Sequence, residues 1–111
     1  MADVAQRRTE DVMRVAVIGG VERTQTTLVR LAADLGHELE FHPGHINGRG
    51  VEEIRRAVGR ADLVVVLTDV NSHGAVKVAR IACQKLGREL VLTKRMGTRD
   101  LIRRLSPAVA A

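Results

Sequence analysis

The chain has 111 residues, of which 45% are hydrophobic and 28% are charged. This length suits a single domain, and this composition excludes intrinsic disorder. The longest apolar run, Leu63 to Leu67, is far too short to cross a membrane. One cysteine, Cys83, excludes an internal disulfide and a cysteine-based zinc cluster, so we expect a cytoplasmic protein.

The formal net charge of +5 suits an anionic partner such as a phosphate, a carboxylate or an acidic protein. Phe41 is the one aromatic residue, however, and proteins that bind single-stranded nucleic acid stack the bases on aromatic rings. We therefore do not expect a nucleic-acid partner.

Glycines and prolines divide the chain into short segments that have the spacing of strands and helices in alternation. Strands are predicted where apolar and β-branched residues run together, and helices where apolar residues recur every three or four positions. After a polar N-terminal arm at residues 1–12, the predicted elements are a strand at 13–18, a helix at 22–35, a strand at 38–41, a loop at 42–50, a helix at 51–58, a strand at 63–67, a helix at 75–86, a strand at 89–92 and a helix at 99–105.

Strands that alternate with helices predict a parallel sheet with right-handed crossovers and helices on both faces. We expect a small α/β domain with four parallel strands in the order 2-1-3-4, similar to a truncated flavodoxin-like or Rossmann-like sheet. The single domain should span residues 13–106, with a tail at 107–111. The exposed edge of so narrow a sheet predicts a homodimer.

Open parallel sheets bind ligands at the carboxyl ends of their strands, and three of the four histidines fall at that edge. His42 and His45 follow the second strand, and His73 follows the third. Neutral imidazoles are suitable ligands for zinc, iron, copper or haem iron, so the three residues are candidate metal ligands that could meet above the sheet. The alternative is that each is a polar loop residue that caps a turn or a helix.

The same edge carries groups suited to an anion. Gly19 and Gly20 join a strand to a helix, and the first backbone N–H groups of a helix bind anions, although the dinucleotide pattern Gly-x-Gly-x-x-Gly is absent. Tight-turn geometry is the alternative explanation of the pair, and Ser72 is either a helix N-cap or an anion ligand. The remaining candidates are Arg23, Lys94 and Arg95 as cations, and Met96 as an axial ligand of haem iron or an apolar loop residue.

The sequence resembles a bacterial family known as domain of unknown function 2325, over about residues 13–105. The matching residues are Val17-Ile18-Gly19-Gly20 with Arg23, Gly36-His37-Glu38-Leu39, His42-Pro43-Gly44, the stretch from Ala61 to Val66, Asp69-x-x-Ser72-His73-x-Ala75, Cys83-Gln84-Lys85 and the basic turn at Lys94-Arg95. The resemblance implies the α/β fold expected above and, through some relatives, haem and oxygen binding. A histidine would then hold the iron, and Arg23, Lys94 or Arg95 would pair with the propionates.

We therefore expect a non-enzymatic haem-binding protein that binds or senses oxygen or another gas. The haem should lie at a subunit boundary, because so small a domain has little interior for a porphyrin. Two alternatives use the same edge, namely a divalent-metal site, zinc foremost, and a regulatory module that binds a phosphate or a nucleotide. We see no activated nucleophile with its base, and Cys83 is predicted to lie in the core, so we lean against an enzyme.

Overall fold

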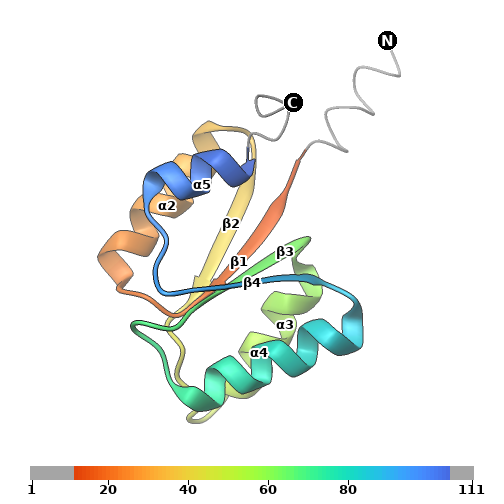
Figure 1. The fold of residues 1–111 in the computed structure, drawn as a ribbon. Coiled ribbons are helices and arrows are strands. Elements are labelled where there is room, and N and C mark those ends of the chain that lie inside the picture. The colour runs from red at the N-terminus through yellow and green to blue at the C-terminus, as the bar shows by residue number, and fades with distance from the viewer. Residues whose placement is uncertain (1–11, 106–111) are drawn as a thin grey trace.

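A computed structural model describes residues 12–105 (Figure 1). The predicted tail lies outside these residues, as does the predicted N-terminal arm except for Val12. None of the helices in the described part of the chain has the length and hydropathy needed to span a membrane. The elements are β1 (Arg14–Ile18), α2 (Glu22–Asp34), β2 (Glu38–His42), α3 (Gly50–Arg60), β3 (Leu63–Leu67), α4 (His73–Leu86), β4 (Glu89–Thr93) and α5 (Thr98–Leu105).

The four strands form one parallel sheet in the order β2-β1-β3-β4, which confirms the predicted topology. Ile18, the last residue of β1, lies opposite His42 of β2 on one side and Val66 of β3 on the other. β3 is buried along its whole length, as its run of leucine and valine predicts for a central parallel strand. β1 and β3 therefore flank the point at which the strand order reverses, where open parallel sheets bind their ligands.

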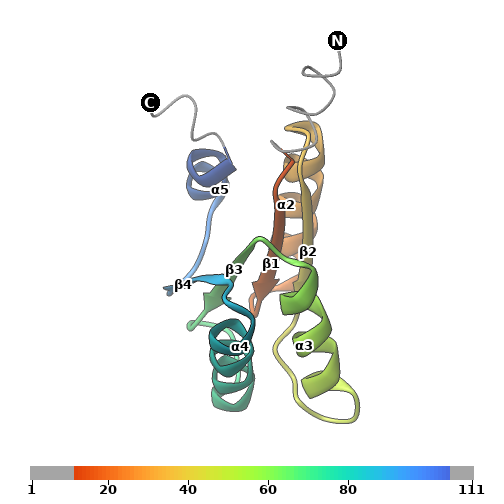
Figure 2. The same ribbon diagram turned by 90° about the vertical axis from the view of Figure 1, so that its right-hand side faces the viewer.

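α3 and α4 cover one face of the sheet, and α2 and α5 cover the other (Figures 1 and 2). Along β1, Ala16 and Ile18 pack with α3 and α4, whereas Val15 and Val17 pack with α2 and α5. This alternation follows from the two-residue period of a strand. The predicted α/β fold with helices on both faces is confirmed.

Local sequence determines where α4 begins and ends. Ser72 caps the helix, because its Oγ accepts a hydrogen bond from the backbone N–H of Ala75 at 3.0 Å. Gly87 ends the helix in the left-handed conformation with φ of 65°, which a glycine adopts without strain. The N-cap prediction for Ser72 is confirmed.

The second strand is longer than predicted. The glycines and the proline of residues 42–50 predict a loop, yet His42 is the final residue of β2 and pairs with Ile18. The strand ends at His42 because the next residue, Pro43, has no N–H with which to continue the ladder. His42 is consequently buried in the fold rather than displayed on a loop.

Candidate functional site

The segments that follow β1, β2 and β3 are tied together at the carboxyl edge of the sheet by Asn71 and Ser72. Asn71 Nδ2 donates to the carbonyl oxygens of Ile18 at 3.1 Å and Leu67 at 2.7 Å, which are the last residues of β1 and β3. Asn71 Oδ1 accepts from the N–H of Ser72 at 2.8 Å, and Ser72 Oγ donates to the carbonyl oxygen of Gly44 at 2.6 Å. Both hydrogen-bonding roles of the Ser72 hydroxyl are thus structural.

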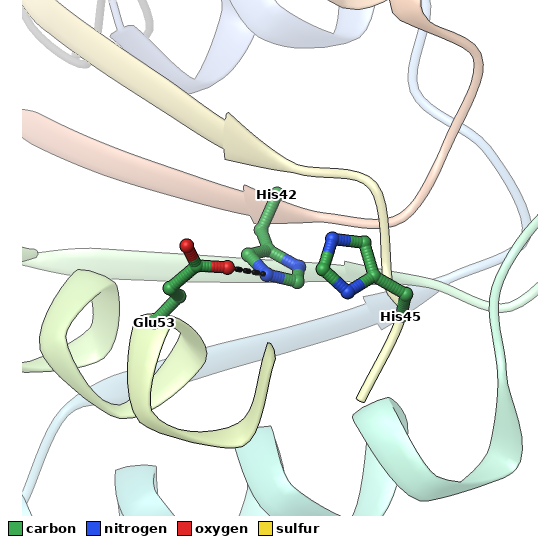
Figure 3. A group of neighbouring side chains, drawn as sticks. All are labelled: His42, His45 and Glu53. Carbon is green, nitrogen blue, oxygen red and sulfur yellow. Dashed lines mark hydrogen bonds and ion pairs between the residues drawn. The ribbon is translucent and has the colours of Figure 1, made fainter. Parts of the chain in front are cut away.

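His42, His45 and Glu53 form a cluster at this edge (Figure 3). One ligand atom from each residue lies within 4.8 Å of those from the other two. His42 Nε2 is 3.2 Å from Glu53 Oε1, and the two imidazole rings have their centroids 4.8 Å apart. The end of β2, the loop after it and the first turn of α3 therefore bring two imidazoles and a carboxylate together.

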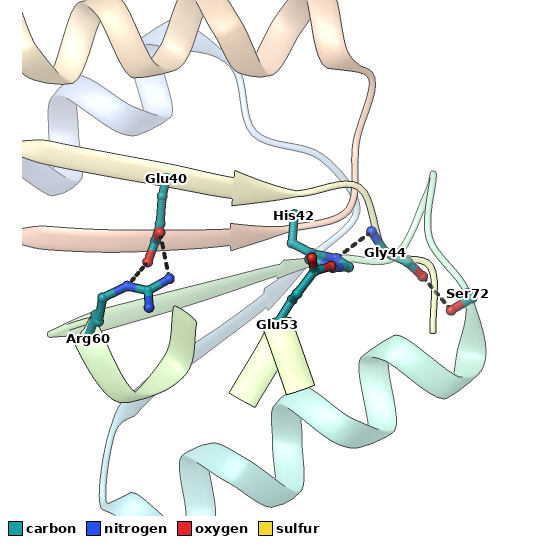
Figure 4. A network of polar contacts seen from close by, with 6 residues as sticks. All are labelled: Glu40, His42, Gly44, Glu53, Arg60 and Ser72. Atoms are coloured by element: carbon teal, nitrogen blue, oxygen red, sulfur yellow. Dashed lines mark hydrogen bonds and ion pairs between the residues drawn. The ribbon is translucent and has the colours of Figure 1, made fainter. Parts of the chain in front are cut away.

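Both ring nitrogens of the buried His42 make hydrogen bonds (Figure 4). Nδ1 accepts from the backbone N–H of Gly44 at 3.0 Å, so this nitrogen presents its lone pair. A neutral imidazole then carries its proton on Nε2, which donates to Glu53 Oε1. The tautomer of His42 is fixed by these two contacts.

Glu53 is the member of the cluster that sequence reasoning missed. A glutamate in the first turn of a helix is usually explained by the helix dipole, and nothing in the helical period distinguishes Glu53 from its neighbour Glu52. The available signal was the position of His42-x-x-His45 directly before an acidic helix start. Gly50 helps to bring these parts together, because a Cβ there would collide with the backbone carbonyl of His45.

His73 is not part of this cluster. It is the first residue of α4, is exposed, and lines a groove of about 480 Å³ along that helix. The groove is completed by Val76, Lys77, Arg80, Ile81 and Gln84. The structure thus brings together two of the three candidate histidines and places the third on a separate surface.

Gly19 and Gly20 form a tight turn whose backbone amides are already used. Both have positive φ, at 104° and 97°, which explains the glycine pair. Their N–H groups donate to the carbonyl oxygens of His42 and Val70, both at 2.7 Å. An anion at this edge must therefore be held by other donors.

A second cleft, of about 330 Å³, lies between the start of α2, the end of β3 and the loop after β4. Lys94, Arg95 and the buried Met96 line it, whereas Arg23 is exposed on the first turn of α2 and is not among its lining residues. Met96 belongs to the core cluster that includes Leu101 and Leu105 of α5. This packing agrees with the interpretation of Met96 as an apolar loop residue.

Two groups at the α3–α4 side of the sheet have shifted pKa values. Burial raises the pKa of the Cys83 thiol above its ordinary 9.0, which suits a core residue and opposes a reactive thiolate. Glu40 raises the pKa of the exposed Arg60 guanidinium, first through hydrogen bonds of 3.1 and 3.0 Å (Figure 4) and then through its charge.

The strand order, the paired helices on each face and the linked carboxyl-edge loops define a small parallel α/β domain of Rossmann-like topology. Residues 14–107 match the family described as "Uncharacterized protein conserved in bacteria (DUF2325)", and the chain belongs to this family. The resemblance noted in the sequence is thereby confirmed. No curated protein sequence matches the chain at a significant level.

Proposed function

We propose that the chain binds one divalent transition-metal ion, zinc foremost, through His42, His45 and Glu53. The observation that carries this proposal is the convergence of their ligand atoms to within 4.8 Å of one another. Imidazole nitrogens and carboxylate oxygens are common zinc ligands. Three protein ligands would leave a fourth position for water or a small molecule, which is the pattern of reactive rather than purely structural zinc sites.

The spacing within the cluster suits a tetrahedral ion. Two ligands that each lie about 2.0–2.1 Å from zinc are about 3.3 Å apart at the tetrahedral angle. His42 Nε2 and Glu53 Oε1 are already 3.2 Å apart. His45 is on an exposed loop and closes the site by a small inward movement, so two ligands are preset and the third adjusts.

The hydrogen bonds of His42 determine what metal binding must displace. Ligation through Nε2 moves the ring proton to Nδ1, which then cannot accept the N–H of Gly44. With a neutral ring, binding through Nε2 therefore releases the Gly44 amide, so metal binding is coupled to a rearrangement of the loop after β2.

The proposal is tested on protein that has been freed of metal with a chelator and then titrated with Zn²⁺ and Co²⁺ in a calorimeter. We expect one ion per chain, an intense visible absorption from tetrahedral Co²⁺, and a large shift of the Gly44 amide resonance. His45→Ala and Glu53→Gln should each weaken binding by about tenfold or more. His73→Ala is the matched control, since His73 is an exposed histidine outside the cluster. Equal affinity in wild-type and His45→Ala protein would refute the site.

Haem binding is a second candidate, and the groove beside His73 is the observation that favours it. A haem needs an axial ligand, apolar contacts and cations for its propionates. The groove offers His73, then Val76 and Ile81, and the basic side chains of Lys77 and Arg80. Because a single helix supplies these residues, a second chain would have to cover the other face of the porphyrin, as expected for a haem at a subunit boundary.

Absorption spectra recorded during addition of haemin separate the two candidates. Haem binding predicts a sharp Soret band that saturates at a fixed ratio of haem to chain and is lost in His73→Ala but kept in His45→Ala. Gas binding then predicts a further shift of that band when the reduced protein meets oxygen or carbon monoxide. A featureless titration of the wild-type protein removes both haem binding and gas sensing.

A further inference from the structure

We propose that the 330 Å³ cleft between α2, β3 and the loop after β4 binds a small phosphorylated compound that also carries hydroxyl or N–H donors. Lys94 and Arg95 would hold the phosphate, and Gln25 and Asp69 would accept hydrogen bonds from the rest of the molecule. The cleft shares no residue with the His42–His45–Glu53 cluster, so this inference does not depend on the metal site.

The side-chain oxygen of Gln25 is the feature that indicates a ligand. The residue is 1% exposed and is among those that line the cleft. Nε2 donates to the carbonyl oxygen of Gly19 at 2.8 Å, whereas Oε1 is buried and has no hydrogen-bond partner among the described residues. Leaving a buried carbonyl oxygen unpaired costs about 1–3 kcal/mol, and a donor on a bound molecule would remove that cost.

The charged residues of the cleft define the ligand further. Lys94 and Arg95 favour an anion, but Asp69 lines the same cleft and opposes one. A bare phosphate would satisfy the two cations only. A compound with a phosphate at one end and hydroxyl or amino groups at the other satisfies the cations, Asp69 and Gln25 Oε1 together.

The start of α2 supplies a second set of donors. Val21, its N-cap residue, lines the cleft and makes no side-chain capping bond. The N–H groups of the first turn therefore lack the partner that a capping side chain provides, and they carry the positive end of the helix dipole. Thr24 of that turn also lines the cleft, so backbone donors and a hydroxyl lie beside the two cations.

The size of the cleft limits the ligand. Small-molecule sites usually occupy about 300–1,000 Å³, and this cleft lies at the lower end of that range. A sugar phosphate or a mononucleotide fits this scale better than a dinucleotide, and the absence of the Gly-x-Gly-x-x-Gly pattern agrees.

Calorimetric titrations in the presence of a chelator test the proposal with five probes: inorganic phosphate, ribose, ribose 5-phosphate, AMP and NAD. We expect ribose 5-phosphate or AMP to bind more tightly than inorganic phosphate, and ribose and NAD to bind least. The double variant Lys94→Ala with Arg95→Ala should bind the phosphorylated probes about tenfold or more weakly than the wild-type protein does. Arg30→Ala with Arg55→Ala is the control, because it removes the same charge at exposed positions outside the cleft.

Gln25→Met tests the acceptor separately from the cations. This substitution should weaken the binding of ribose 5-phosphate and leave the affinity for inorganic phosphate unchanged. Amide resonances give a readout that does not depend on a folded variant, and the wild-type signals of Val21, Thr24 and Gly97 should shift on addition of ribose 5-phosphate. The proposal fails if no phosphorylated probe binds at millimolar concentration, if inorganic phosphate binds as tightly as ribose 5-phosphate, or if the shifted signals lie elsewhere.

Discussion

Gly20 occupies a position where a side chain would meet both backbone strain and a collision. Its φ is 97°, and an added Cβ would strike the amide group of Gln25. Gly20→Ala should therefore lower the free energy of unfolding by about 2 kcal/mol or more, from left-handed strain and the disturbed Gln25 hydrogen bond. Urea denaturation followed by circular dichroism measures the change.

Gly59→Ala is the matched control, since Gly59 lies inside α3 with ordinary φ, and a Cβ added there would meet open space. Replacing a helical glycine by alanine should raise stability by about 0.5–1 kcal/mol. We expect the two substitutions to change the free energy of unfolding in opposite directions. A similar change in both variants would show that the turn after β1 tolerates a side chain.

The buried thiol of Cys83 makes stability depend on alkaline pH. Its pKa is raised in the folded protein by burial, so the native chain keeps a proton that the unfolded chain releases above about 9. The contribution is complete below the ordinary pKa of 9.0 and is lost as the pH rises beyond it. Urea titrations from about pH 8 to about pH 10 should show a shallower decline of the unfolding free energy in Cys83→Ala than in the wild type. Parallel slopes would contradict the prediction.

At the scale of elements, Ser72 joins the start of α4 to the loop after β2. Ser72→Ala removes the cap on Ala75 N–H and the donor to Gly44, and should cost about 1–2 kcal/mol of unfolding free energy. Ser72→Thr keeps a hydroxyl and should retain most of the stability. Chemical denaturation of the two variants distinguishes them, and an equal loss in both would show that the hydroxyl is not what holds the elements together.

The fold followed from the sequence because each element is marked by local chemistry. The apolar run Leu63–Leu67 predicts a doubly covered strand, and Gly87 ends α4 where the sequence suggests. The sequence predicted the candidate site less completely than the fold, because the site depends on which helix turn faces which strand end. The acidic start of α3 follows His42-x-x-His45, but the helical period does not show that Glu53 rather than Glu52 meets His42. No local pattern indicates that the ladder extends far enough to bury that histidine.

For the whole molecule, the homodimer stays a prediction. β2 and β4 are the outer strands of the sheet, and within residues 12–105 each has one edge without a partner strand. Such edges favour pairing with a second copy. Light scattering coupled to size-exclusion chromatography should give twice the chain mass of 12.1 kDa. A mass of one chain at every concentration tested would rule the dimer out.

Metal binding should stabilise the entire domain, because the His42–His45–Glu53 cluster joins the end of β2 to the start of α3. A ligand that binds only the folded state adds about 2.7 kcal/mol at a free concentration one hundred times its Kd. For a domain of this size that corresponds to a rise of about 10 °C or more in the melting temperature. Thermal unfolding with Zn²⁺ should show this rise, a chelator should reverse it, and His45→Ala should abolish it while His73→Ala retains it. A Zn²⁺ effect of equal size in both variants would mean that the ion stabilises the chain from another site.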